Sequence, residues 1–259
     1  MTGRALNAPV FESLIPRAHH GSFWRELDKE DRARLVMLAG RTRRVAAGET
    51  LFHRGSTGSE VLIVLEGFVK VMSMAGETLN LQAIRAPGQL LGEQEALQRG
   101  GTTVRRVSAQ ALTKCRVLVV TSAAFRSFLE EHSRAWEALA RELGDRLRES
   151  ETRVEGMAAD AANRRLARAL VSLLDPGEVL RVGTGPLQLR LSQADLASWI
   201  GTSRETVERI LRDWRTRGLV ETGYRSIRVM SPTDMFRIAG LPGLPFASAV
   251  PAPRVAGKR

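Results

Sequence analysis

The stretch from residue 191 to residue 229 constrains what this chain can fold into more than any other part of the sequence. Ser192 stands three positions before Asp195 at the edge of an apolar run, a pairing that predicts the capped start of a short helix. Gly201 then favours a tight turn, because glycine adopts backbone conformations that other residues rarely reach. A short helix followed by such a turn is typical of the first half of a helix-turn-helix.

A second helix is predicted to begin after Ser203 and to end at Gly218. Its apolar residues have the spacing of one buried stripe: Val207, Ile210, Leu211 and Trp214. Two short strands are predicted around Thr222–Arg225. The whole pattern indicates a helix-turn-helix with a wing, in which the second helix can enter the major groove of DNA.

Charged side chains lie off the apolar stripe of this second helix: Arg204, Glu205, Glu208 and Arg209. An arginine can donate two hydrogen bonds to guanine, and a glutamate can accept one from cytosine, so these residue types suit base recognition. The alternative is a solvated face whose charges form ion pairs four residues apart.

The string GTSRETVERIL, at residues 201–211, closely resembles the recognition helix of the cyclic-AMP receptor protein and fumarate-nitrate regulator (CRP/FNR) family. The resemblance implies that three residues read a GTGA-like half-site: Arg204, Glu205 and Arg209. It implies that two others hold DNA phosphates: Ser203 and Thr206. Arg225, in the predicted wing, is a further DNA-binding candidate.

Short apolar and β-branched blocks punctuated by glycines occupy residues 48–72, and similar blocks follow over Leu79–Ile84 and Val104–Val120. About eight short strands at this spacing predict a jelly-roll barrel. The string GETLFHRGSTGSEVLIVLEGFVKV within this region is similar to the cyclic-nucleotide-binding domain of the same family. The alternative is a jelly roll that binds no ligand.

The resemblance implies an effector pocket in this barrel for cAMP or another cyclic nucleotide. The family's nucleotide-binding residues match Gly92, Glu93 and Arg105, where the arginine would bind phosphate and the glutamate a ribose hydroxyl. The match requires a longer loop over residues 98–103, and it departs from the family at Arg106, where serine is usual. Arg106 would crowd the pocket or add positive charge to it. The alternative is that Glu93 and Arg105 pair with each other in an empty barrel.

A long helix is predicted between the two domains, with the heptad seam of a helix that pairs with its twin. The seam comprises Trp136, Ala140, Leu143, Leu147, Val154 and Met157, with Leu139 beside it. Ser150 lies on this seam, and the resemblance implies that it reaches the nucleotide base from across a homodimer. The alternative is a small polar residue tolerated at a helix interface.

Composition limits the other possibilities. The 259 residues carry a net charge of +11, which fits two domains and a polyanionic partner. No run of about 18 apolar residues is present, so we expect no membrane span and a cytoplasmic protein. The single cysteine, Cys115, cannot hold an iron–sulfur cluster, and His19 and His20 have no third ligand nearby, so no metal is expected. No catalytic motif is present, so we expect no enzyme.

These observations predict an α+β protein with a β jelly-roll similar to a cyclic-nucleotide-binding domain, a long dimerisation helix and a C-terminal winged helix-turn-helix. The expected parts are an N-terminal tail (1–24), the sensor domain (25–133), the dimerisation helix (134–159), the DNA-binding domain (160–240) and a disordered tail (241–259).

The resemblance implies a homodimeric transcription regulator that binds palindromic double-stranded DNA under effector control and recruits or blocks RNA polymerase. Three alternatives stay open at this point. The protein is an effector-independent repressor or architectural protein with an empty barrel, or the barrel regulates an enzyme or channel, or the effector is not a cyclic mononucleotide.

Overall fold

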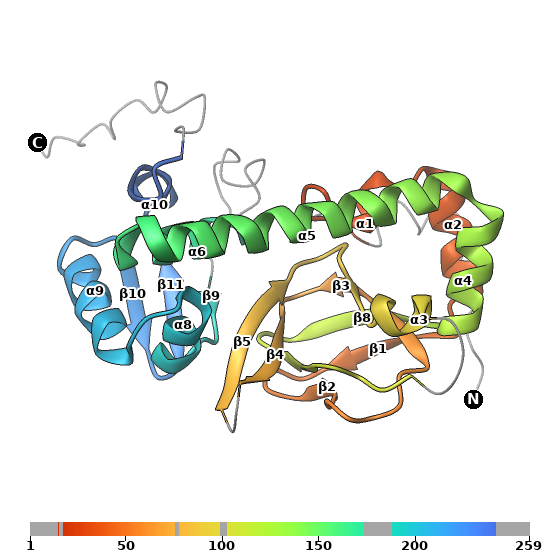
Figure 1. The fold of residues 1–259 in the computed structure, drawn as a ribbon, viewed down its shortest axis with the longest axis horizontal. Coiled ribbons are helices and arrows are strands. Elements are labelled where there is room, and N and C mark those ends of the chain that lie inside the picture. The colour runs from red at the N-terminus through yellow and green to blue at the C-terminus, as the bar shows by residue number, and fades with distance from the viewer. Residues whose placement is uncertain (1–14, 16–17, 76–77, 99–102, 174–187, 242–259) are drawn as a thin grey trace, which may run out of the picture.

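The computed structural model describes these residues: 15, 18–75, 78–98, 103–173 and 188–241. One long helix runs along the molecule, with a β-barrel beneath one half of it and a smaller domain at its other end (Figure 1). The predicted tail over 241–259 lies outside the described residues, apart from Leu241. None of the described helices is long and apolar enough to cross a membrane.

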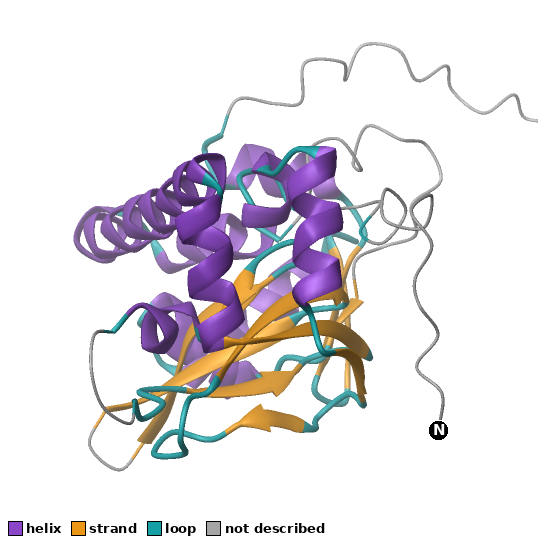
Figure 2. Cartoon of the chain, turned by 90° about the vertical axis from the view of Figure 1, so that its right-hand side faces the viewer, coloured by secondary structure: helices purple, strands orange, loops and turns teal. Residues whose placement is uncertain are grey.

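Eight described strands form the barrel, in two antiparallel sheets with the orders β1-β8-β3-β6 and β2-β7-β4-β5. The strands are β1 (Arg41–Val45), β2 (Thr50–Phe52), β3 (Glu60–Glu66), β4 (Val69–Ala75), β5 (Thr78–Arg85), β6 (Leu90–Leu91), β7 (Ser108–Ala111) and β8 (Cys115–Thr121). One buried cluster collects Val64 and Val117 from the first sheet with Val71 and Ala109 from the second. The predicted jelly-roll barrel is confirmed, and Figure 2 shows the helices gathered along one side of its strands.

The chain that precedes the barrel packs against it. Phe23 and Trp24 are buried in a second core cluster, and the Phe23 ring lies 5.7 Å from the ring of Phe125. The expected tail over 1–24 is therefore wrong for residues 18–24, because burial of two large aromatic side chains is strongly favourable. Three helices complete this part: α1 (Phe23–Glu26), α2 (Lys29–Leu38) and α4 (Ser122–Glu131).

Helix α5 (Ser133–Ala159) joins the two domains and has two different faces. Leu139, on one face, is buried against the barrel. The face that carries the predicted heptad seam is open, since Leu147 is 60% exposed and Val154 is 65% exposed. Leu143 departs from this pattern, because it is partly buried against the barrel core.

The C-terminal domain contains the predicted helix-turn-helix and wing. Ser192 and Asp195 form the predicted capping box, and Gly201 ends that helix with a φ of 63°, which glycine adopts without strain. The apolar stripe of the next helix is buried as predicted: Val207, Ile210, Leu211 and Trp214. The elements are α6 (Ala162–Val171), β9 (Gln188–Leu189), α8 (Gln193–Ile200), α9 (Arg204–Thr216), β10 (Val220–Gly223), β11 (Ser226–Val229) and α10 (Pro232–Ile238).

The helix-turn-helix docks on the barrel of the same chain, with α8 beside β5 (Figure 1). Lys70 of the barrel pairs with Asp195 at 3.2 Å, and the two side chains are only 8% and 16% exposed. The backbone amide of Leu81 donates to Ser198 Oγ at 3.0 Å, and the Leu81 side chain joins the apolar core of the C-terminal domain. The C-terminal domain is therefore held by both polar and apolar contacts with the barrel.

Candidate functional site

The start of α9 is organised by two hydroxyl groups. Ser203 Oγ accepts a hydrogen bond from the Thr206 backbone amide at 3.2 Å and lies 3.1 Å from Thr206 Oγ1. Both hydroxyls thus lie together at the N-terminal end of the helix, whose partial positive charge favours anions. This placement fits the phosphate-holding roles that the sequence predicted for the two residues.

The charged face of α9 is largely free of internal partners. Arg204, Glu205 and Arg209 are exposed, and no ion pair among the described residues uses either arginine. The solvated ion-pair alternative applies instead to Glu208, which accepts from Arg212 at 3.0 Å. Arg204 and Arg209 are therefore available to an external acceptor.

Glu205 is a ready hydrogen-bond acceptor on the same face. Hydrogen bonds from its own backbone amide and from Ser203 hold the pKa of the Glu205 carboxyl below its usual value, and Arg204 adds to this effect. The carboxylate is therefore ionised near neutral pH, the form that accepts a hydrogen bond from a cytosine amino group.

A groove of about 580 Å³ separates α9 from the wing and from the start of α8. Arg204, Arg215 and Arg225 line it. Arg225 lies at the β10–β11 turn beside Tyr224, whose side chain is 93% exposed. The structure thus brings the predicted wing residue and the predicted recognition helix to one basic surface.

A second cavity, of about 520 Å³, lies between the barrel and α5. We call it the barrel cavity. Four of the five predicted effector residues line it: Gly92, Glu93, Arg106 and Ser150. Five further charged residues in its wall were not predicted from the sequence: Arg85, Glu95, Arg146, Glu149 and Arg153.

Gly92 and Glu93 lie where β6 passes into the short helix α3 (Glu93–Leu97). Gly92 has a φ of 81°, and a Cβ atom there would clash with Arg105 Nη1. No other residue fits this position without moving the arginine. The backbone therefore passes directly against the Arg105 guanidinium.

Arg105, the predicted phosphate ligand, is not in the wall of the barrel cavity. Its Nη1 donates to Glu95 Oε2 at 2.9 Å, its Nη2 donates to the carbonyl of Glu60 at 2.5 Å, and Phe52 covers its face at 4.3 Å. Arg105 and Glu95 are 4% and 5% exposed. A buried carboxylate requires a counter-charge, and Arg105 supplies it for Glu95.

Glu93 does not pair with Arg105 either, so the ion pair of the empty-barrel alternative is absent between these two described residues. Glu93 instead accepts from Arg146 of α5 at 2.5 Å. Burial raises the pKa of the Glu93 carboxyl, but Arg146, the Glu93 backbone amide and Arg85 together lower the pKa more, so the group is ionised. Spacing within the sequence could not reveal a partner 53 residues away.

Arg146 connects the barrel cavity to the long helix. It also pairs with Glu142 one turn earlier and donates to the carbonyl of Leu90 at 2.7 Å. Glu142 is buried and accepts the backbone amides of Phe23 and Leu90 at 2.6 and 3.0 Å. Glu93 is therefore joined directly to α5 through Arg146.

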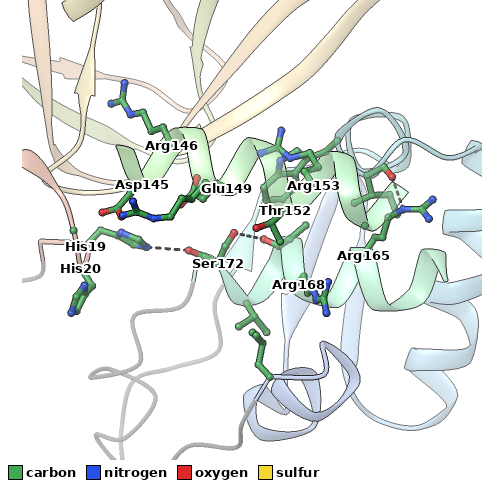
Figure 3. Close-up of a pocket in the computed structure, with 18 of the residues that line it drawn as sticks. His19, His20, Asp145, Arg146, Glu149, Thr152, Arg153, Arg165, Arg168 and Ser172 are labelled. Carbon is green, nitrogen blue, oxygen red and sulfur yellow. Dashed lines mark hydrogen bonds and ion pairs between the residues drawn. The ribbon is translucent and has the colours of Figure 1, made fainter. Parts of the chain in front are cut away.

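A third cavity, of about 550 Å³, lies at the junction of α5, α6 and residues 19–21 (Figure 3). Its arginines hold α6 within the C-terminal domain, since Arg165 donates to the carbonyl of Ile200 at 2.9 Å and Arg168 to that of Ala239 at 2.8 Å. Figure 3 also shows the hydrogen bond from the His19 ring to the carbonyl of Ser172, 3.0 Å long. These partners make the cavity a structural junction.

Comparison with known proteins follows the same two-part division. Residues 42–132 match the cyclic nucleotide-binding domain, and residues 164–237 match the Crp-like helix-turn-helix domain. The chain is 30% identical over 234 residues to the cyclic AMP receptor protein of Thermus thermophilus, covering 90% of this chain and 97% of that protein. It is 28% identical over 193 residues to a CRP-like cAMP-activated global transcriptional regulator of Mycobacterium tuberculosis, covering 74% and 85%.

Among solved structures, the c-di-GMP responsive global regulator CLP of Xanthomonas campestris has a similar fold. The TM-score is 0.62 at 20% sequence identity, and the match covers 79% of this chain and 100% of that chain. This likeness concerns the arrangement of barrel, long helix and helix-turn-helix.

Proposed function

This chain belongs to the CRP/FNR family of transcription regulators, and from that premise we propose which DNA it reads and what controls it. It is a DNA-binding transcription regulator with a cyclic nucleotide-binding domain. We place it in the cytoplasm with the DNA that it binds. No enzymatic step is part of the proposal.

Arg204, Glu205 and Arg209 read a GTGA-like half-site in the major groove, while Ser203, Thr206 and Arg225 hold the DNA backbone. The observation that carries this proposal is the exposed donor set on α9, because neither Arg204 nor Arg209 forms an ion pair with a described residue. Arginine without an internal acceptor can donate both bonds to guanine.

The protein acts as a homodimer that pairs through the open face of α5. The exposed Leu147 and Val154 support this role, because a seam of apolar side chains gains stability when a second helix covers it. Two-fold symmetry would then place two recognition helices about 34 Å apart, one turn of DNA, on a palindrome. The bound dimer recruits or blocks RNA polymerase.

An anionic nucleotide in the barrel cavity controls this dimer. The cavity is lined by Glu93, whose partner Arg146 lies on the dimer helix, so occupancy would change how α5 sits on the barrel. The relatives named above respond to cAMP or to c-di-GMP, so the family likeness leaves the nucleotide open.

An effector-independent DNA-binding protein is the second candidate. The buried ion pair between Arg105 and Glu95 favours it, because the predicted phosphate ligand is already neutralised within the chain. In that case the DNA affinity would not change with any nucleotide.

The purified protein is expected to bind a GTGA-type palindrome at least ~10³-fold more tightly than a scrambled duplex of the same length. Fluorescence titration of both duplexes at one fixed salt concentration measures this ratio, because phosphate contacts alone vary steeply with salt. Equal affinity for the two duplexes would overturn the proposed sequence reading. A shift in affinity when a nucleotide is added separates effector control from the second candidate.

A further inference from the structure

The groove between α9 and the wing, which we call the α9–wing groove, is positively charged. Its wall contains Arg204 and Arg215 of α9 and Arg225 of the β10–β11 turn, and none of the described residues that line it is acidic. Arg204 and Arg225 form no ion pair with a described residue, and Arg215 donates to a neutral acceptor, Thr222 Oγ1, at 3.2 Å. No carboxylate of the wall therefore neutralises these three guanidinium groups.

The α9–wing groove follows the length of α9. Arg204 and Arg215 are about three helical turns apart, so they lie on the same side of the helix and are separated by about 16 Å along its axis. Gln193, the first residue of α8, also lines the groove, where the N-terminal end of that helix adds partial positive charge. A long basic groove with polar donors fits one sugar–phosphate strand of DNA.

A strand in this groove determines what the wing faces. One sugar–phosphate strand separates the major groove of a duplex from the next minor groove. Since α9 is proposed to enter the major groove, a strand beside α9 would have the wing on its far side. The tip of the wing, at Tyr224 and Arg225, would then point into the minor groove.

The tip of the wing has two features that the fold itself does not use. The aromatic side chain of Tyr224 is 93% exposed, although burial of a tyrosine ring is normally favourable. Arg225 has a φ of 47° and is the one residue other than glycine, among those that the structure describes, with a positive φ. This conformation strains arginine but not glycine. An arginine at a strained and exposed turn indicates a role outside the protein.

We propose that the wing enters the minor groove beside each half-site, where Arg225 selects A·T base pairs and the Tyr224 ring packs against the deoxyribose. This inference rests on the proposed reading of the major groove by α9, and it gives Arg225 a role beyond the DNA backbone. The minor groove of A·T-rich DNA is narrow and strongly negative, which attracts arginine, whereas a G·C pair places an amino group on its floor. The selected base pairs lie about five positions from the centre of the half-site, half a turn of DNA.

Titration of the full-length protein with GTGA-type palindromes tests the proposal. The duplexes carry A·T, G·C or inosine·cytosine pairs either outside the half-sites or in the spacer between them. Inosine lacks the amino group of guanine, so its pair with cytosine has the minor-groove edge of an A·T pair and the major-groove edge of a G·C pair. At one of the two places, A·T and inosine·cytosine duplexes are expected to bind alike and about fivefold or more tightly than G·C. Equal affinity for inosine·cytosine and G·C duplexes at both places would overturn the inference.

Three variants assign this preference to the wing. Arg225→Gly should abolish the preference for A·T pairs and should melt no lower than the wild type, because glycine adopts this φ without strain. Tyr224→Ala should weaken binding to all of the duplexes several-fold, because the ring contact does not depend on the base. Arg217→Ala, which removes an exposed arginine of the same domain outside the groove wall, is the matched control and should keep the wild-type preference.

The outcomes separate this inference from the proposed function. A preference for A·T pairs that Arg225→Gly retains would come from the bending of the DNA and would overturn the inference, while the reading by α9 would stand. Equal weakening of all the duplexes by Arg225→Gly would overturn it too, because Arg225 would then contact phosphate alone. A wild type that binds the palindrome no better than a scrambled duplex would overturn the proposed function itself.

Discussion

Replacing Leu147 by aspartate is expected to convert the protein from a dimer to a monomer and to weaken binding to palindromic DNA by about 10²–10⁴-fold. Leu147 is 60% exposed in the protomer and lies between Ala140 and Val154 on the open face of α5. Pairing of two such helices would bury one charge from each protomer in the apolar seam, at a cost of several kcal/mol. Loss of the dimer removes the gain that comes from binding two half-sites together.

Analytical ultracentrifugation and DNA titration measure the two effects of Leu147→Asp. Thr152→Asp is the matched control, because it adds the same charge to the same helix at an exposed position away from the seam. Leu143→Asp is a poorer probe, since Leu143 also packs against the barrel core. A Leu147→Asp variant that sediments as a dimer would place the dimer interface elsewhere.

Asp195→Ala is expected to lower the free energy of unfolding by about 3–5 kcal/mol. The carboxylate has two roles, since it completes the capping box with Ser192 and pairs with Lys70 of the barrel at 3.2 Å. Loss of a cap costs about 1 kcal/mol, and the larger part comes from leaving the buried Lys70 ammonium unpaired. Urea unfolding measures the difference.

Two variants separate these contributions. Asp213→Ala makes the same change at an exposed pair with Arg217 and should cost less than about 1 kcal/mol. Lys70→Met combined with Asp195→Asn removes both charges and should recover part of the loss. A cost for Asp195→Ala no greater than that for Asp213→Ala would contradict the docked arrangement of the two domains.

The contribution of Asp195 to the free energy of unfolding should also depend on pH. Burial raises the pKa of this carboxyl, but hydrogen bonds from Ser192 and the charge of Lys70 lower it more, so the pKa in the folded protein lies below its usual value. The stabilisation is therefore complete above the unfolded pKa of about 3.9 and is lost as the pH falls through the folded pKa. The stability difference between wild type and Asp195→Ala should shrink in acid.

Elements specified by local signals could be predicted from the sequence. The Ser192–Asp195 capping box and the left-handed Gly201 are contained within a few residues, and both form as expected. The buried apolar stripe of α9 could be predicted from the helical spacing of its apolar residues alone. The aromatic pair Phe23 and Trp24 also carried a strong local signal for burial, which the assignment of a tail overlooked.

The pairing of charges in the barrel could not be predicted in the same way. Glu93 and Glu95 are two residues apart on α3, so a helix directs them to nearly opposite sides. Glu93 therefore meets Arg146 of α5, and Glu95 meets Arg105. Which carboxylate neutralises Arg105 depends on where α5 lies, and that is set by packing far away in the sequence.

Base specificity of Arg209 tests the account most directly. The measurement is the affinity of wild type and Arg209→Ala for palindromes in which each base pair of the GTGA half-site is changed in turn. The wild type should lose about 1–3 kcal/mol of binding free energy per changed base pair. Arg209→Ala should bind equally well whichever base pair stands at one position, and should still discriminate at the other positions. Arg212→Ala, whose side chain pairs with Glu208, should keep the wild-type profile. Equal weakening by Arg209→Ala on every duplex would show that Arg209 contacts phosphate alone and would contradict the proposed reading of DNA.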